Sequence, residues 1–199
     1  LKVSRMTVNR ALRELANDGY IERIGGVGTF VSEPISQGHI LEIRNIAEEI
    51  EERGHLYSAK VIQLDKVIAP IKVANMLELS KGAPVFHSQI VHYENKIPIQ
   101  LENRYVTPAF APNYLKVDFS VTNTTEYLLG VAALQEVEHI IHAILPDKRT
   151  ARLLKIELNH PCLLLERRTW SSNTVVTYSL LYHPGLRYTL GDRFAPRSH

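Results

Sequence analysis

The stretch VSRMTVNRALRELANDG, residues 3–19, predicts an amphipathic helix close to the start of the chain. Its apolar residues recur at the i, i+3, i+4, i+7 spacing of one helical face, which holds Val8, Ala11, Leu12 and Leu15. Ser4 stands where a residue caps the first turn, and Gly19 stands where a helix ends. The faces turned away from the apolar stripe are polar and basic, and the first turn of such a helix favours a bound phosphate.

Two short β runs follow, residues 20–24 and 29–31, and the glycine-rich turn GGVG at residues 25–28 joins them. A helix followed by a glycine-turned hairpin is typical of a winged DNA-binding module, whose helix enters the major groove. We therefore expect DNA contacts from the polar start of the helix and from the turn, namely from Ser4, Arg5, Thr7, Asn9, Arg10 and Gly26.

The net charge of the chain, +2, resides in this same segment. Residues 1–31 carry five cations against three anions, and residues 32–199 balance to zero. A local positive face is what phosphate binding needs. The alternative is that the basic helix is only a solvated surface.

The run VSRMTVNRALRELANDGYIERIGGVGTFV, residues 3–31, resembles the recognition helix and wing of the GntR family of bacterial transcription regulators. Later stretches at residues 41–50, 90–106 and 182–188 resemble the histidine-utilisation repressor branch of that family. The resemblance implies that the C-terminal part is an effector-sensing UTRA domain with a chorismate lyase-like α/β fold, and that urocanate is the effector. Asn9 departs from the pattern, because relatives often carry arginine there, and this bears on base preference.

The chain starts at Leu1 without an initiator methionine, and the two helices that precede the recognition helix in such regulators are missing from it. We therefore expect a truncated winged helix-turn-helix, with recognition helix and wing only, at residues 1–31. The polar segment SEPISQG at residues 32–38 reads as a linker. The effector-binding domain is expected at residues 39–199.

Composition favours an intracellular protein. The only cysteine, Cys162, lies in an apolar run, so no intrachain disulfide is possible, and a buried, inert thiol is a better interpretation than a reactive one. The chain has no run of about twenty apolar residues and no signal-like start. We expect a cytoplasmic protein with no membrane partner.

Alternating strands and short helices predict an α+β fold with a mainly antiparallel sheet, covered mainly on one face so that the other can form a pocket. Helical spacing of Ile43, Ile46, Ala47 and Ile50 predicts a first helix that ends at Gly54, with the glutamates Glu48, Glu49, Glu51 and Glu52 on its solvent side. The further segments are strands at residues 58–65, 85–93, 97–106, 131–144, 163–170 and 175–182, and helices at residues 70–79 and 147–155.

The period of two along a strand sorts the polar residues of this sheet into faces, and those of neighbouring strands can converge on a pocket. We expect Arg104 to hold the carboxylate of the effector, Glu102 its ring N–H, and a tyrosine to form a wall. Glu102 also matches the strand glutamate that UTRA domains use for effectors, while the alternative is an ordinary surface pair between Glu102 and Arg104. The predicted effector-binding residues are Ser88, His92, Glu102, Arg104, Tyr178 and Tyr182.

The pair His139 and His142 raises the possibility of a metal site. On the predicted strand the two side chains point to opposite faces, so we expect no metal there. We predict no catalytic residues and no cofactor, because no nucleophile and base stand at a recognisable spacing. The function that we expect is a homodimeric, ligand-responsive transcription repressor that binds operator DNA. The alternatives are a regulator that senses another small acid or a sugar phosphate, and an enzyme with a chorismate lyase-like domain.

Overall fold

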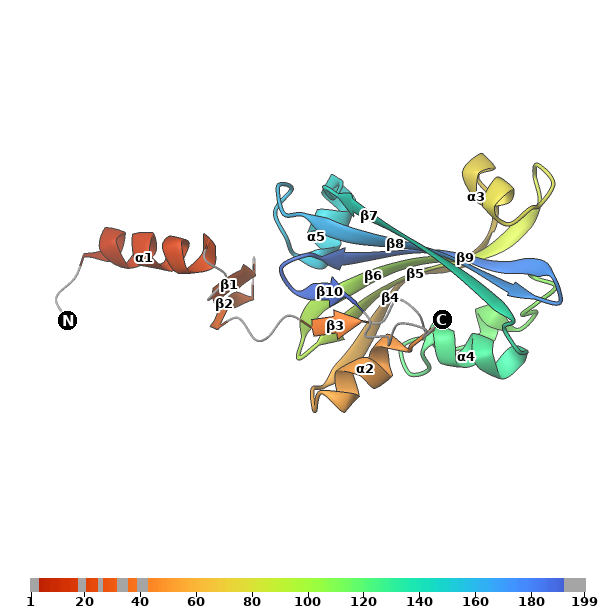
Figure 1. The fold of residues 1–199 in the computed structure, drawn as a ribbon, viewed down its shortest axis with the longest axis horizontal. Helices are drawn as coiled ribbons and strands as arrows, with labels where there is room; N and C mark the ends of the chain where they lie inside the picture. The colour runs from red at the N-terminus through yellow and green to blue at the C-terminus, as the bar shows by residue number, and fades with distance from the viewer. Residues whose placement is uncertain (1–3, 18–20, 25–26, 32–35, 39–42, 192–199) are drawn as a thin grey trace, which may run out of the picture.

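Six strands form an antiparallel sheet in the order β4-β5-β6-β9-β8-β7 (Figure 1). The computed structural model describes residues 4–17, 21–24, 27–31, 36–38 and 43–191. After β6 the chain crosses to the far edge of the sheet, where it forms β7, and then returns through β8 to β9, which pairs with β6. This confirms the α+β fold with a mainly antiparallel sheet. The bounds are β4 Tyr57–Ile68, β5 Pro84–Glu94, β6 Ile97–Val106, β7 Glu136–Ile144, β8 Cys162–Ser171 and β9 Thr174–Pro184.

Two hairpins of the sheet, β5–β6 and β8–β9, close on tight turns. In the β5–β6 turn Asn95 and Lys96 have φ of 49° and 69°, and in the β8–β9 turn Ser172 and Asn173 have φ of 49° and 59°. Positive φ at both central residues belongs to the turn whose twist matches that of the flanking strands. These two turns fix the registers that carry the site.

Helices lie on both sides of the sheet, so the prediction that it is covered mainly on one face is wrong. In Figure 1, α3 and α5 lie on one side, and α2 and α4 lie on the other. The reason is that β5 is apolar on both faces: Val85 packs beneath α3, and Phe86 packs in the cluster that contains Leu128 of α4. The bounds are α2 Ile46–Glu52, α3 Ile71–Met76, α4 Thr124–Val131 and α5 Lys148–Leu154, with a short 3-10 helix η1 at Tyr114–Lys116.

The predicted strand at residues 131–144 begins five residues later than expected, after helix α4 and a connection. The segment expected as one strand at residues 131–144 is the end of α4, a connection, and β7 from Glu136. The side chain of Asn123 caps α4 by accepting a hydrogen bond from the backbone N–H of Thr125 at 2.8 Å. The cap is a local signal for a helix that the apolar pattern alone did not reveal.

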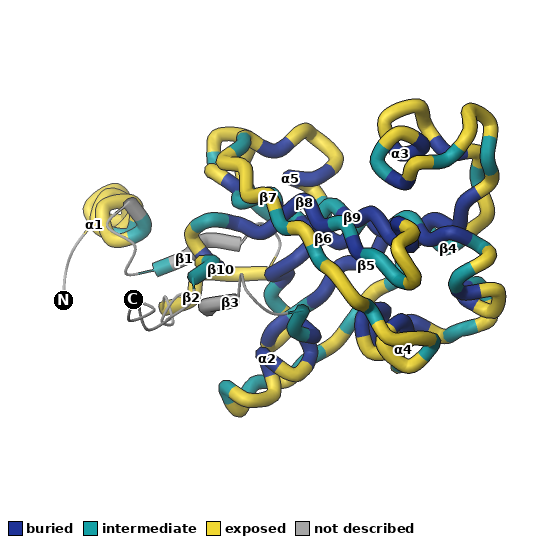
Figure 2. The backbone as a smooth tube through the Cα atoms, turned by 45° about the vertical axis from the view of Figure 1, so that its right-hand side comes forward, coloured by how far each residue is buried: buried dark blue, intermediate teal, exposed yellow. Residues whose placement is uncertain are grey.

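The N-terminal segment contains α1 Arg5–Asn17 and a hairpin of β1 Ile21–Ile24 and β2 Gly28–Val31, as predicted. Ser4 caps α1, because its Oγ accepts the backbone N–H of Thr7 at 3.1 Å. Figure 2 shows α1 as exposed beside a sheet whose middle strands are buried. Within the described residues, the predicted apolar stripe of α1 is uncovered.

A parallel pair of strands, β3 Ser36–Gly38 and β10 Tyr188–Leu190, lies beside the sheet. Residues 36–38 belong to the segment expected as a linker, whose remaining residues lie outside the described ones. The pairing ties the end of that segment to a strand from the far end of the chain. Among the described residues, no helix is both long and apolar enough to span a bilayer.

Candidate effector-binding site

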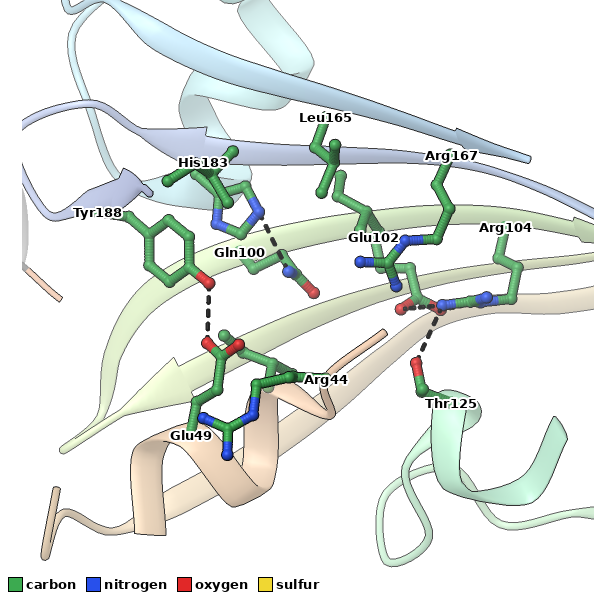
Figure 3. A pocket seen from close by; sticks show the side chains of 13 residues that line it. Arg44, Glu49, Gln100, Glu102, Arg104, Thr125, Leu165, Arg167, His183 and Tyr188 are labelled. Carbon is green, nitrogen blue, oxygen red and sulfur yellow. Dashed lines mark hydrogen bonds and ion pairs between the residues drawn. The ribbon is translucent and has the colours of Figure 1, made fainter. Parts of the chain in front are cut away.

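A pocket opens on the face of the sheet that α2 and α4 cover (Figure 3). Its cavity volume is about 20 Å³, which is room for about one water molecule. The lining side chains come from α2, α4, β6, β8, β9, β10 and the approach to α2. They are Arg44, Ile46, Glu49, Gln100, Glu102, Arg104, Thr125, Leu165, Arg167, Leu181, His183, Tyr188 and Leu190.

Glu102 and Arg104 form a buried, two-pronged ion pair at the floor of the pocket. The Nε of Arg104 donates to Oε1 of Glu102 at 2.8 Å, and its Nη2 donates to Oε2 at 3.0 Å. Thr124 donates its hydroxyl to the same carboxylate at 2.8 Å, and Nη2 of Arg104 also donates to the hydroxyl of Thr125 at 3.3 Å. Both threonines open α4, so the ion pair docks that helix onto the sheet.

The two charges of this pair stabilise one another. Burial opposes ionisation of Glu102, but the charge of Arg104 and the hydrogen bonds to the carboxylate outweigh it, so the pKa of Glu102 lies well below its usual 4.5. Burial likewise opposes the charge of Arg104, and Glu102 outweighs it, which raises the pKa of Arg104. The pair is therefore ionised at neutral pH, and it is not the ordinary surface pair that the sequence left open.

Arg167 supplies a second buried guanidinium, and it is 5% exposed. Its Nε donates to Nε2 of His139 at 2.7 Å. Within the described residues it has no carboxylate partner. Burial and the nearby charge of Arg104 lower the pKa of Arg167 to about 10, so it stays charged at neutral pH. Glu102 and Glu49 act on this charge from beyond ion-pair distance, so the guanidinium can still bind an anion directly.

A flat wall and an acceptor lie at the other end of the pocket. The rings of His183 and Tyr188 stack with centroids 4.0 Å apart, and the hydroxyl of Tyr188 donates to Oε2 of Glu49 at 2.8 Å. The amide of Gln100 donates to Nε2 of His183 at 3.2 Å. Burial, together with the charge of Arg167, lowers the pKa of His183 to about 3, so this imidazole is neutral at neutral pH.

The charged side chains that line the pocket are three arginines and two glutamates. Arg44 is also paired with Glu52 outside the pocket, at 3.1 Å. Because Arg104 is paired with Glu102 and Arg44 with Glu52, Arg167 is the lining arginine whose guanidinium keeps N–H groups for a ligand, and Glu49 lies at the other end of the pocket. A cation at one end and a carboxylate at the other suit a ligand that carries an anionic group and an N–H donor.

The other predicted strand residues lie beside the pocket rather than in its wall. Ser88 and His92 share the sheet face of Glu102, as predicted from the period of two. The hydroxyl of Ser88 is hydrogen-bonded to that of Tyr114 at 2.7 Å, and Nδ1 of His92 is bonded to the hydroxyl of Tyr57 at 2.9 Å. His92 lies behind Glu102, with Nε2 at 3.7 Å from Oε2. Both residues support the floor of the pocket.

The prediction that Tyr178 and Tyr182 form a pocket wall is wrong. Tyr178 pairs with Tyr105 across the β6–β9 ladder, so the even-numbered residues of β9 point to the face opposite Glu102. Tyr178 packs in the core beneath α3 and donates to Glu166 at 2.8 Å. Tyr182 packs near Leu154 of α5. The odd-numbered Leu181 and His183 take the positions in the pocket instead.

Glu49 is the clearest residue that the sequence analysis misplaced. It was expected on the solvent side of its helix, but it is 6% exposed, while Glu48, Glu51 and Glu52 are exposed as predicted. Its position three residues after Ile46 puts it on the buried stripe of α2. Arg167 was missed as well, although it stands two residues after Leu165 and therefore on the same face of β8. A charge at an apolar position was the available signal in both cases.

The predicted DNA-contacting side chains lie at the start of α1, and those of Ser4, Arg5, Thr7, Asn9 and Arg10 are all exposed. Arg10 forms an ion pair with Glu14 at 3.0 Å, one turn along the helix. Such an exposed pair contributes little to stability and leaves the arginine free to exchange partners. Gly26 lies outside the described residues.

The histidines of β7 are arranged as the strand pattern predicts. His139 contacts Arg167 on the pocket side of the sheet, whereas Nε2 of His142 lies 3.4 Å from Glu166 on the opposite face. In the described part of the chain, no three histidine, cysteine or acidic residues are grouped to hold a metal ion. Cys162 is buried, and burial raises the pKa of its thiol to about 11, which makes it a poor nucleophile.

Comparison with known proteins places both segments of the chain. Residues 52–189 match the UTRA domain, and residues 1–31 match the bacterial regulatory proteins of the gntR family. The chain is 51% identical to the histidine utilization repressor of Pseudomonas aeruginosa, over 98% of this chain and 78% of that protein. The C-terminal domain of the histidine utilization repressor of Pseudomonas syringae pv. tomato is 44% identical, with a TM-score of 0.69 over 71% of this chain and 100% of that one. PhnF from Mycobacterium smegmatis is 25% identical, with a TM-score of 0.76 over 98% of this chain and 87% of that one.

Proposed function

The chain belongs to the histidine utilization repressors of the GntR family, and from this premise we propose that it represses histidine-utilisation genes and senses urocanate in the pocket of its UTRA domain. Its relatives are DNA-binding repressors and not enzymes. The work of such a protein is to bind operator DNA and to change that binding when an effector arrives. We place it in the cytoplasm, where its operator is.

The observation that carries the effector proposal is the free guanidinium edge of Arg167. Its Nε is engaged by His139, which leaves both Nη groups to donate to a carboxylate. Arg104 cannot serve in the same way while it forms its ion pair with Glu102. The carboxylate of urocanate is thus assigned to Arg167, in place of the Arg104 expected from the sequence.

The rest of a urocanate molecule is a flat, conjugated imidazole, and the opposite end of the pocket has matching chemistry. The stacked pair of His183 and Tyr188 offers a flat surface, and Glu49 offers a carboxylate that can accept from a ring N–H. Glu102 is less available for this role, because its two oxygens already accept hydrogen bonds from Arg104 and Thr124.

The size of the cavity suggests how binding becomes a response. A space for about one water molecule cannot hold urocanate unless the walls move. Two of those walls are Tyr188 and Leu190 of β10, and β10 pairs with β3, which lies between the pocket domain and the DNA-binding segment. If the ligand displaces β10, the paired strand β3 moves with it, and this changes the placement of the DNA-binding helix α1.

Isothermal titration calorimetry tests the effector. We expect urocanate to bind with one site per chain, and histidine, which carries an extra ammonium group beside its carboxylate, to bind much more weakly because that cation would approach Arg167. A sugar phosphate with two negative charges is the competing ligand class. If the sugar phosphate binds and urocanate does not, the effector assignment is wrong while the assignment as a repressor stands.

A further inference from the structure

A row of polar side chains crosses the middle of the sheet on the face that carries the pocket. Ser179 of β9 pairs with Arg104 of β6 on one side and with Arg167 of β8 on the other. Residues that are directly opposite one another in neighbouring strands point to the same face of a sheet, and their side chains are neighbours. Ser179 therefore stands between two buried arginines that line the pocket (Figure 3).

The hydroxyl of Ser179 has no hydrogen-bond partner among the described residues, although the residue is 0% exposed. By contrast, the hydroxyl of Thr177, two residues earlier on the same face of β9, is hydrogen-bonded to that of Thr169 at 2.6 Å. A buried polar group without a partner destabilises a fold, and most buried hydroxyls are therefore paired. The packing of this domain alone does not account for a hydroxyl at residue 179.

The chemistry of the neighbouring side chains explains what would pair with this hydroxyl. A guanidinium only donates hydrogen bonds, so neither Arg104 nor Arg167 can accept the O–H of Ser179. An anion beside Arg167 could accept from the guanidinium and from the hydroxyl at the same time. Arg167 is the arginine of the row that is able to bind such an anion, because Arg104 is already paired with Glu102.

We propose that Ser179 belongs to the effector-binding site, where its hydroxyl donates a hydrogen bond to the anionic group that Arg167 binds. The proposal rests on the proposed function, because it concerns the same pocket and the same guanidinium. Ser179 does not line the closed pocket, whereas Leu181 on the same face of β9 does, as do the arginines on either side. A ligand that widens the pocket between Arg104 and Arg167 therefore uncovers Ser179.

The alternative is that residue 179 must only be small, to leave room for the two arginines. Alanine meets that need equally well, so Ser179→Ala separates the two roles. Calorimetry should show a loss of about 10-fold in urocanate affinity, because the ligand loses a hydrogen bond to its charged group. The free energy of unfolding without ligand, measured by urea denaturation, should be unchanged or higher, because the deleted hydroxyl makes no hydrogen bond in the unliganded chain.

The matched control is Thr177→Val, which removes a buried hydroxyl from the same face of the same strand and keeps the size of the side chain. It should give the opposite pattern. The variant should be less stable than the wild type, because Thr169 loses its partner and remains buried. Its urocanate affinity should be unchanged, because Thr177 is not between the two arginines.

The outcomes distinguish the role of Ser179 from the identity of the effector. Equal urocanate affinity in the wild type and Ser179→Ala would overturn the role of Ser179, and so would a clear loss of stability in the unliganded variant, which would make the hydroxyl part of the fold. A wild type that binds glucose 6-phosphate in place of urocanate would overturn the effector alone, and Ser179→Ala should then weaken the sugar phosphate instead. Binding of neither ligand by the wild type would overturn both proposals.

Discussion

The Nε of Arg167 donates a hydrogen bond to Nε2 of His139 across 2.7 Å, and this contact joins the pocket to the edge strand β7. Because a guanidinium only donates, Nε2 of His139 is the acceptor and the imidazole carries its proton on Nδ1. A ligand that draws Arg167 toward its carboxylate acts on His139 as well. The proposed effector site therefore reaches the edge strand β7 through one side chain.

Replacement of Arg167 by glutamine should weaken urocanate binding by about 10- to 100-fold, because a hydrogen bond to a charged group contributes roughly 1.5–3 kcal/mol. Calorimetry measures the loss directly. Arg167→Lys should recover only part of it, since an ammonium cannot reproduce the two-pronged contact.

The matched control for Arg167 is its neighbour Arg168, which points to the other face of β8. Arg168 lies over the ring of Trp170 at 4.5 Å and pairs with Glu78 at 3.2 Å. Arg168→Gln should therefore leave urocanate affinity unchanged. Equal affinities for wild type and a folded Arg167→Gln variant would remove Arg167 from the site.

Glu102→Gln should destabilise the fold by about 3–5 kcal/mol, because it leaves the buried charge of Arg104 without its partner. The sequence alone suggested a direct contact between Glu102 and the ligand. The structure instead makes Glu102 the residue that positions Arg104 and docks α4 through Thr124. Urea denaturation monitored by circular dichroism measures the loss.

A double variant tests whether the loss of stability comes from the unpaired charge of Arg104. Glu102→Gln combined with Arg104→Met removes both buried charges, and it should be more stable than Glu102→Gln alone. If the single variant is as stable as the wild type, the ion pair does not dock α4.

The strands and their faces could be predicted because a period of two survives wherever a strand is regular. Ser88, His92, Glu102 and Arg104 were expected on converging faces of neighbouring strands, and they share one face of the sheet. The relation between β6 and β9 could not be predicted, because they are separated by about 70 residues of chain and no local feature fixes their register. That register decided which face Tyr178 occupies.

The charged lining of the pocket was missed for a different reason. Glu49 and Arg167 each stand at a position where the pattern requires an apolar residue, and the usual interpretation of such a residue is solvent exposure. The tertiary structure alone shows that Glu49 and Arg167 line the same small cavity. Glu49 comes from α2, Arg167 from β8 and Tyr188 from β10, which no local pattern connects.

Arg5→Ala and Arg10→Ala should each lower affinity for operator DNA, because both side chains are exposed at the start of α1. An arginine that contacts a guanine edge contributes about 1–3 kcal/mol of base discrimination, whereas one that contacts only phosphate weakens binding to all sequences alike. Gel-shift titrations against the operator and a scrambled sequence distinguish the two roles.

An exposed arginine of the sensor domain, Arg152 on α5, is the control for these titrations. Arg152→Ala removes the same charge from a site far along the chain, and it should leave operator affinity unchanged. Unaltered affinity and base preference in both α1 variants would end their assignment as DNA contacts.

The stability of the domain should depend on pH between 6.5 and 4.5 chiefly through its buried histidines. Burial, together with the charge of Arg167, lowers the pKa of His183 from 6.5 to about 3, and burial also lowers that of His87. In the unfolded chain His183 binds a proton as the pH falls below 6.5, whereas in the folded protein it does so only near pH 3. The free energy of unfolding therefore falls as pH is lowered, by about 1.4 kcal/mol per pH unit for one such proton.

His183→Gln removes this contribution and keeps that of His87, so its stability should fall less steeply between pH 6.5 and 4.5 than that of the wild type. Glu102 does not confuse the comparison, because its depressed pKa makes it a source of stability above pH 4.5 that is lost only as pH falls below that value. Urea denaturation at several pH values gives both curves, and their slopes are compared because the substitution also changes packing against Tyr188. Parallel curves would mean that His183 takes up its proton in the folded protein, and the pocket would then lack the neutral imidazole on which the proposed ligand surface depends.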